Sequence, residues 1–132
     1  MKHDVGARAT LTRIIDAALV EGFAHVTGDT NPVHLDEEFA ATTRFGRRIA
    51  HGMLLGGLIS NVLANDLPGR GTIYLSQTLS FKKPVFLGDA VTVTVTVTER
   101  KSDKPILSLQ TVCTNQDGVM VADGVATVLA PE

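Results

Sequence analysis

The sequence predicts an α+β fold in which a curved antiparallel sheet wraps around one central apolar helix, and two observations lead to it. The segment 51–65 contains no Asp, Glu, Lys or Arg and is apolar on nearly every side, which is typical of a helix buried around most of its circumference. The segment 91–98 reads VTVTVTVT, the period-two alternation of a half-buried strand. A sheet that packs its valine face against the helix satisfies both patterns.

The first third of the chain predicts short elements joined by capping residues. Residues 8–15 alternate weakly and predict a short strand, after a loose tail at 1–7. Asp16 is a suitable N-cap for a helix over 17–26, and Gly28 is a suitable stop. Asp36 can cap a second, shorter helix over 37–40, where Glu37 and Glu38 favour the first turn through the helix dipole. Residues 42–50 predict an irregular basic segment.

The last half of the chain predicts strands only. Runs at 72–81, 91–98, 106–114 and 119–129 alternate or are β-rich, and turn residues separate them at 86–89, 102–105 and 115–118. Four consecutive strands with short connections predict an antiparallel meander. Because long, uncharged edge strands invite pairing with another chain, we expect a homodimer with a continuous or back-to-back sheet.

Length and composition favour one domain over residues 1–132, and they exclude several classes of protein. The net charge is −2, from 12 basic and 14 acidic residues, which argues against a nucleic-acid partner. The N-terminus lacks the apolar core of a signal peptide, and no apolar run is long enough to cross a bilayer, so we expect a cytoplasmic protein without membrane contact. The single cysteine, Cys113, lies in an apolar run and is expected to be a buried filler.

The stretch Thr27-Gly-Asp-Thr-Asn-Pro-Val-His34 is the candidate for chemistry. Pro32 disfavours helix at Asn31, so Asp29 and His34 are expected on a bent loop, where their side chains can converge. A carboxylate and an imidazole can together accept, donate or orient a proton near neutral pH. The same residue types also make an ordinary turn, and this alternative stays open on spacing alone.

The start of the apolar helix offers a second group. Its first N–H groups have no intrahelical partner, and Gly52 has no side chain to block an approaching carbonyl, so it can form an oxyanion hole or simply ease a tight bend. His51 is expected to cap or pack. Ser60 either bonds back to a helical carbonyl or orients the acid–imidazole pair. Three apolar residues are candidates for core or for the wall of a pocket: Leu55, Ile59 and Leu63.

These motifs resemble those of a known family. The sequence from Phe23 to Ala40, with Gly-Asp-Thr-Asn-Pro-Val-His at its centre, matches the signature of the MaoC-like, hydratase-2 group of hot-dog proteins. Segments 48–53, 80–85 and 88–89 resemble later parts of that group, and the resemblance spans about 8–129. It is greatest to single-domain (R)-specific enoyl-CoA hydratases that supply polyhydroxyalkanoate synthesis.

The resemblance implies a function and residue roles. It implies syn addition of water to a trans-2-enoyl-CoA, giving an (R)-3-hydroxyacyl-CoA, without cofactor or metal. The catalytic pair falls on Asp29 and His34, the oxyanion donor on the Gly52 N–H, and the supporting positions on Asn31 and Ser60. The phosphates of an acyl-CoA would meet cations among five basic residues: Arg44, Arg47, Arg48, Lys82 and Lys83.

Two other functions compete with hydration. The first is a hot-dog thioesterase, or a related acyl-carrier-protein dehydratase. Such dehydratases carry an acidic residue on the central helix, and 52–65 has none. The second is a non-catalytic acyl-CoA-binding module, which would not need an acid and an imidazole together. A thioesterase would release a free thiol, whereas a hydratase would only remove the enoyl absorbance.

Overall fold

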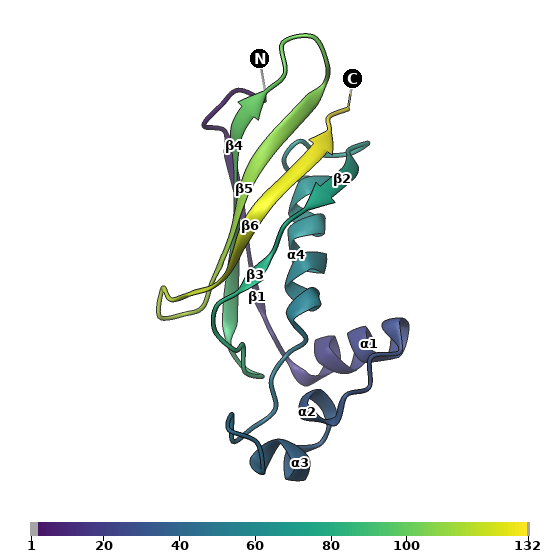
Figure 1. The fold of residues 1–132 in the computed structure, drawn as a ribbon, viewed down its shortest axis with the longest axis vertical. Helices are drawn as coiled ribbons and strands as arrows, with labels where there is room; N and C mark the ends of the chain where they lie inside the picture. The colour runs from purple at the N-terminus through teal and green to yellow at the C-terminus, as the bar shows by residue number, and fades with distance from the viewer. Residues whose placement is uncertain (1–2, 132) are drawn as a thin grey trace.

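A computed structural model of the chain describes residues 3–131, and Figure 1 shows one layer of sheet with one long helix beside it. This part of the chain contains six strands and four helices, with all four helices between the first strand and the second. Their order is β1 (Arg8–Ile14), α1 (Ala17–Thr27), α2 (Pro32–Leu35), α3 (Glu37–Ala41), α4 (Gly52–Asn65), β2 (Ile73–Gln77), β3 (Ser80–Phe81), β4 (Ala90–Arg100), β5 (Ile106–Thr114) and β6 (Met120–Leu129). The predicted α+β class with one central helix is confirmed, and the arrangement is a hot-dog fold.

The sheet is antiparallel throughout, in the order β1-β4-β5-β6-β2, and β3 also pairs with β6. Strands β4, β5 and β6 form the expected meander. The segment 72–81 is not the first strand of that meander, because it lies beyond β6 rather than beside β4. It is also two strands rather than one, with an irregular register between Tyr74 and Ser76. Strands β5 and β6 therefore lie between this segment and β4 in the sheet.

Helix α4 lies along one face of the sheet, and the core forms between them (Figure 1). The valines of β4 point to this face and are almost wholly buried, as the alternation predicts. The helix contributes six buried side chains: Leu54, Leu55, Leu58, Ile59, Val62 and Leu63. None of the helices in the described part of the chain is long and apolar enough to cross a membrane.

The structure confirms the predicted caps of the helices near the N-terminus. The Asp16 carboxylate accepts from the Leu19 N–H at 2.9 Å, and Asp36 caps α3 through the N–H groups of its first turn. Gly28 ends α1 in the left-handed conformation at φ 80°, which only glycine adopts without strain.

The N-terminal residues differ from expectation. Residues 1–2 lie outside the described range, but residues 3–7 are not a loose tail. The Gly6 N–H donates to the Val97 carbonyl at 2.8 Å, and the Val97 N–H donates to the Ala7 carbonyl at 2.9 Å. Arg100 forms an ion pair with Asp4 at 3.1 Å. These contacts continue the pairing of β1 with β4 and hold the segment on the sheet.

Helices α1, α2 and α3 gather beyond one end of the sheet, next to the N-terminus of α4 (Figure 1). This placement brings the loop after α1 to the unpaired N–H groups with which α4 begins. Two segments far apart in the sequence, 28–34 and 49–53, therefore meet at one end of the molecule.

Candidate active site

A cavity of about 440 Å³ lies where these segments meet. Its lining includes a carboxylate, two imidazoles and three cations, which come from the loop after α1, the segment before α4 and the segment after β3. The lining residues are Asp29, His34, Arg44, Phe45, Ile49, Ala50, His51, Gly52, Met53, Leu55, Phe81, Lys82, Lys83, Pro84 and Val85. Three sequence-based candidates, Asp29, His34 and Gly52, therefore share one cavity.

The loop that carries Asp29 is built from side-chain turns. The Asp29 carboxylate accepts from the Asn31 N–H at 3.3 Å, and the Asn31 side chain accepts from the Val33 N–H at 3.3 Å. Asn31 thereby caps the short helix α2, with Pro32 at its start. The chain does not stay a loop up to His34, as the sequence suggested, because proline initiates a helical turn. The turn interpretation and the site interpretation thus describe the same residues.

His34 is held by the backbone of the segment before α4. Its Nδ1 lies 2.8 Å from the Ile49 carbonyl, and because a carbonyl only accepts, Nδ1 carries the proton. Nε2 is then the nitrogen available to a ligand in the cavity. Burial lowers the pKa of His34 below 6.5, outweighing the Ile49 carbonyl and the Asp29 carboxylate, which raise it, and a charge on His51 would lower it further.

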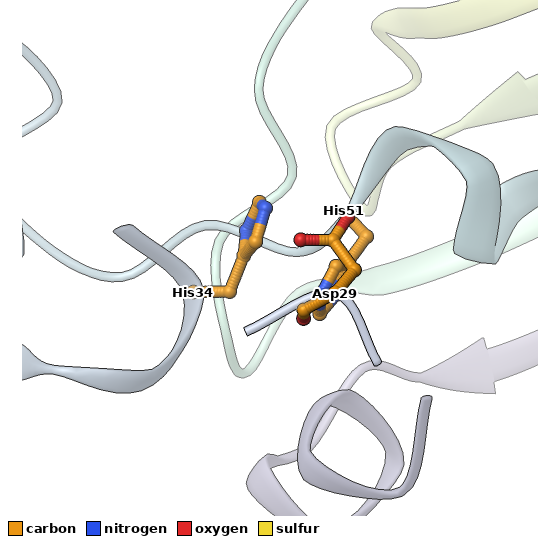
Figure 2. A group of neighbouring side chains, drawn as sticks. All are labelled: Asp29, His34 and His51. Carbon is orange, nitrogen blue, oxygen red and sulfur yellow. The ribbon is translucent and has the colours of Figure 1, made fainter. Parts of the chain in front are cut away.

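The side chains of Asp29, His34 and His51 form one cluster, and the Asp29 carboxylate points toward the His34 ring (Figure 2). The His34 and His51 rings are stacked, with centroids 3.8 Å apart and an angle of 28° between the planes. His51 is 2% exposed and serves as the N-cap residue of α4 without a side-chain capping bond. The expectation of a cap or packing residue is met in both respects.

The same cluster is the candidate for a metal site, since its three ligand atoms lie within 4.8 Å of one another. Ligands around tetrahedral zinc are separated by roughly 3.4 Å, given metal–nitrogen bonds of about 2.0–2.1 Å. Stacked rings direct their lone pairs side by side rather than toward one ion. One nitrogen of each ring also bonds a backbone carbonyl. The arrangement does not converge on a single ion, and we assign it no metal.

Gly52 opens α4 at the cavity wall. Within residues 3–131 its N–H makes no hydrogen bond, so it is one of the free donors that a helix N-terminus presents. A Cβ at this position would lie 2.8 Å from Cε1 of Phe81, which shows why glycine fits here. Phe81 itself was not singled out from the sequence, where it reads as one residue of an alternating strand; only the fold places its ring over Gly52.

The basic residues divide into two groups. Arg44, Lys82 and Lys83 line the cavity. Arg48 does not, because its Nε donates to the His34 carbonyl at 2.7 Å and its guanidinium is paired with Glu21 and Glu37. The guanidinium of Arg47 lies 3.9 Å from the centre of the Phe86 ring, away from the lining.

Other candidates are not brought into this cavity. Ser60 lies half-buried on α4 and lines neither this cavity nor a second one of about 480 Å³ bounded by Met53, Gly56, 74–77, Leu79 and Phe81. Ile59 and Leu63 are fully buried in the core, whereas Leu55 lines the first cavity. Cys113 is also buried, which raises the pKa of its thiol to about 11 and fits the expected filler.

Comparisons with known proteins find a family and relatives that match nearly the whole chain. A family model described as MaoC like domain matches residues 2–117. The chain is 51% identical to an (R)-specific enoyl-CoA hydratase of Aeromonas caviae over 97% of this chain and 96% of that enzyme. It is 48% identical to another from Rhodospirillum rubrum, over 96% and 87%.

Solved structures give the same result for the fold. An (R)-hydratase from A. caviae, described as involved in PHA biosynthesis, superposes with a TM-score of 0.95 at 51% identity, covering 97% of each chain. An unliganded R-hydratase from Pseudomonas aeruginosa gives 0.94 at 50% identity, covering 98% of this chain and 83% of that one. The family match and these identities extend over nearly the whole chain. The chain therefore belongs to the MaoC-like family.

Proposed function

We propose that this chain is an (R)-specific enoyl-CoA hydratase, which adds water to a trans-2-enoyl-CoA to give an (R)-3-hydroxyacyl-CoA. The observation that carries the proposal is the convergence of three groups in one cavity: the Asp29 carboxylate, the His34 imidazole and the free Gly52 N–H. The high identity to (R)-specific enoyl-CoA hydratases over the whole chain supports it independently.

Hydration needs a proton acceptor and a proton donor on one face of the alkene. In the proposed reaction, Asp29 and His34 hold a water above the double bond. As the water oxygen bonds to the β-carbon, one group takes its proton, and a proton is delivered to the α-carbon on the same face. The pair takes up one proton and gives one up, so the total number of protons that it holds is unchanged by the addition.

Negative charge moves to the thioester oxygen as the oxygen–carbon bond forms. We propose that the Gly52 N–H donates to that oxygen, aided by the positive end of α4. A donor fixed by the helix does not need to reorganise during the reaction. Asn31 supports the pair by capping α2, while Ser60 is too far along α4 to line the cavity and is proposed only as a distant support.

Coenzyme A carries phosphates, and we propose Arg44, Lys82 and Lys83 as their partners because these three cations line the cavity. Arg48 is removed from the candidates by its internal bonds. The acyl chain is proposed to pass Leu55. Ile59 and Leu63 would support that wall from the core behind it.

A homodimer is also part of the proposal. Strand β2 pairs with β6 on one side, and within residues 3–131 no strand covers its other edge. Apolar side chains near this edge are at least half exposed: Met53, Ile73, Leu75 and Phe81. A second copy that pairs along β2 would cover them and continue the sheet. Light scattering during gel filtration is expected to give twice the mass of one chain. The variant Leu75→Lys should lower the measured mass to that of a single chain.

The proposed location is the cytoplasm, in which a free, buried thiol stays reduced. The A. caviae relative is described as involved in PHA biosynthesis, and we propose that this chain is involved in it too.

The test is to incubate the protein with trans-2-enoyl-CoAs of several chain lengths. Hydration predicts loss of the enoyl-thioester absorbance, no release of free thiol, and a product that chiral analysis identifies as the (R)-3-hydroxyacyl-CoA. Release of thiol would support a thioesterase, and binding without turnover would support an acyl-CoA-binding module. An (S)-product would contradict the proposed face of addition.

A further inference from the structure

We propose that His51 is a positioning residue that sets Asp29, His34 and the Gly52 N–H relative to one another. It touches each of the three in a different way. Its Nε2 lies 3.0 Å from the Asp29 carbonyl, its ring stacks on the His34 ring, and it directly precedes Gly52 in the chain. Figure 2 shows the ring next to both side chains. The inference rests on the proposed function, because it concerns the reaction of the same site.

The protonation of His51 follows from its partners. A backbone carbonyl only accepts, so Nε2 carries the proton and donates it to the Asp29 carbonyl. Nδ1 is buried and has no hydrogen-bond partner among residues 3–131. With Nε2 engaged and Nδ1 sealed from the cavity, the ring has no free position from which to exchange a proton with a substrate. His51 therefore acts through its neighbours rather than on the substrate.

The environment holds the ring in one place. His51 is 2% exposed, and Phe23 of α1 packs against it with ring centroids 4.8 Å apart at 53°. The ring is thus enclosed between α1 and His34, while its N–H reaches the loop after α1. A rotation of the ring would break the bond to Asp29 and the stack on His34 together.

The imidazole combines two functions that other side chains offer singly. Phenylalanine keeps a flat ring for His34 but leaves the Asp29 carbonyl without its donor. Glutamine keeps an N–H donor for that carbonyl but removes the ring that shields His34 from water. The variants His51→Phe and His51→Gln therefore separate the two contacts.

The two variants are expected to differ in a way that a general loss of packing would not produce. Both should lower kcat about ten- to a hundredfold with little change in KM, because a misplacement of about 1 Å costs rates of this size. In His51→Gln the acidic limb of the pH–rate profile should also move to higher pH, since water reaches His34 and its burial-lowered pKa rises. In His51→Phe the ring remains and only the effect of a charge on His51 is lost, so the limb should move less than in His51→Gln.

The matched controls are His25→Phe and His25→Gln, because His25 is exposed on α1 and lies outside the cavity. Both should keep wild-type kcat and pH profile. Thermal unfolding is measured for all four proteins. Wild-type kcat in the His51 variants, or equal losses of kcat and folded fraction with no difference between their pH profiles, would overturn the inference. Inactive wild-type protein would instead refute the proposed function.

If the His51 variants do not fold, a measurement on the wild-type protein tests the proposed role of His51. Long-range ¹H–¹⁵N NMR spectra distinguish the tautomers of a histidine ring. We expect a proton on Nε2 of His51 and on Nδ1 of His34 in the protein without substrate. A proton on Nδ1 of His51 would exclude the bond to the Asp29 carbonyl and refute the inference, whatever the activity.

Discussion

The two cavities of this protein have similar volumes, about 440 and 480 Å³, and share Met53 and Phe81 in their walls, yet their linings differ in kind. In the second cavity the polar groups bond one another. The Tyr74 hydroxyl donates to the side-chain oxygen of Gln77, whose nitrogen donates to the Thr111 hydroxyl at 3.0 Å. Burial raises the pKa of Tyr74 to about 12, so this hydroxyl keeps its proton.

In the first cavity the reactive groups are not fully occupied by hydrogen bonds to other groups of the protein. His34 uses only Nδ1 for the backbone, and the Gly52 N–H makes no hydrogen bond within residues 3–131. Because the two cavities have similar volumes, the volume of a cavity does not indicate which one is the reaction site. What distinguishes the site is the presence of polar atoms that the fold positions but leaves free for a ligand.

The largest expected effect comes from removing the two acid–base side chains of the first cavity. Asp29→Asn and His34→Gln should each lower kcat by about 10²–10⁴-fold, the usual contribution of an acid–base group, with a fold still intact. Crotonyl-CoA hydration measures the rate, and circular dichroism checks the fold. Asp103→Asn and His25→Gln, at exposed positions, are matched controls that should keep wild-type rates. Near-normal hydration by either site variant would contradict the proposed mechanism.

The next effect is a pH dependence. Because burial lowers the pKa of His34, its ring stays neutral to a pH below 6.5 and becomes protonated only under more acidic conditions. If the reaction needs the neutral ring, kcat/KM should be constant near pH 7 and fall about tenfold per pH unit below the lowered pKa. The measurement is a profile of kcat/KM against pH. A midpoint above 6.5 would show that His34 is not the titrating group, or that its pKa is not lowered.

A smaller effect should follow from a single methyl group at the helix start. Gly52→Ala places a Cβ against the Phe81 ring, and the displaced ring or helix end should lower kcat about tenfold. Phe81→Ala opens that space, so the double variant should recover part of the loss. Kinetics of the two single variants and the double variant form the test. Additive losses would show that the Gly52–Phe81 contact does not limit the oxyanion donor.

The smallest effect concerns the cations at the cavity. Lys82→Ala and Lys83→Ala should each raise KM for an enoyl-CoA about two- to fivefold, the size of one exposed ion pair, and leave kcat unchanged. Arg47→Ala is the matched control, because Arg47 lies over Phe86 rather than in the lining. A short thioester without the nucleotide should show no change in KM. An equal rise in KM for both substrates would assign these lysines a role other than phosphate binding.

Local pattern was enough for most of the elements. The valine–threonine alternation predicts β4 and its buried face, and the uncharged segment predicts α4, because side-chain period follows directly from backbone geometry. The Asp16 and Asp36 caps and the Gly28 stop were predictable for the same reason, since their partners lie within four residues. The strand order was not predictable in this way. The segment 72–81 pairs with β6, which is distant in the sequence, and no local signal encodes that choice.

The sequence by itself determined the loop chemistry around Asp29 and His34, the glycine at the start of α4, and the family resemblance. Only the tertiary structure decided that these groups share a cavity, that Arg48 is bonded internally while Lys82 and Lys83 face the cavity, and that Ile59 and Leu63 are core. The physical reason is the distance along the chain between the residues that interact. Turns and caps depend on neighbours in the chain, whereas the site depends on how α1, α2 and α4 pack at one end of the sheet.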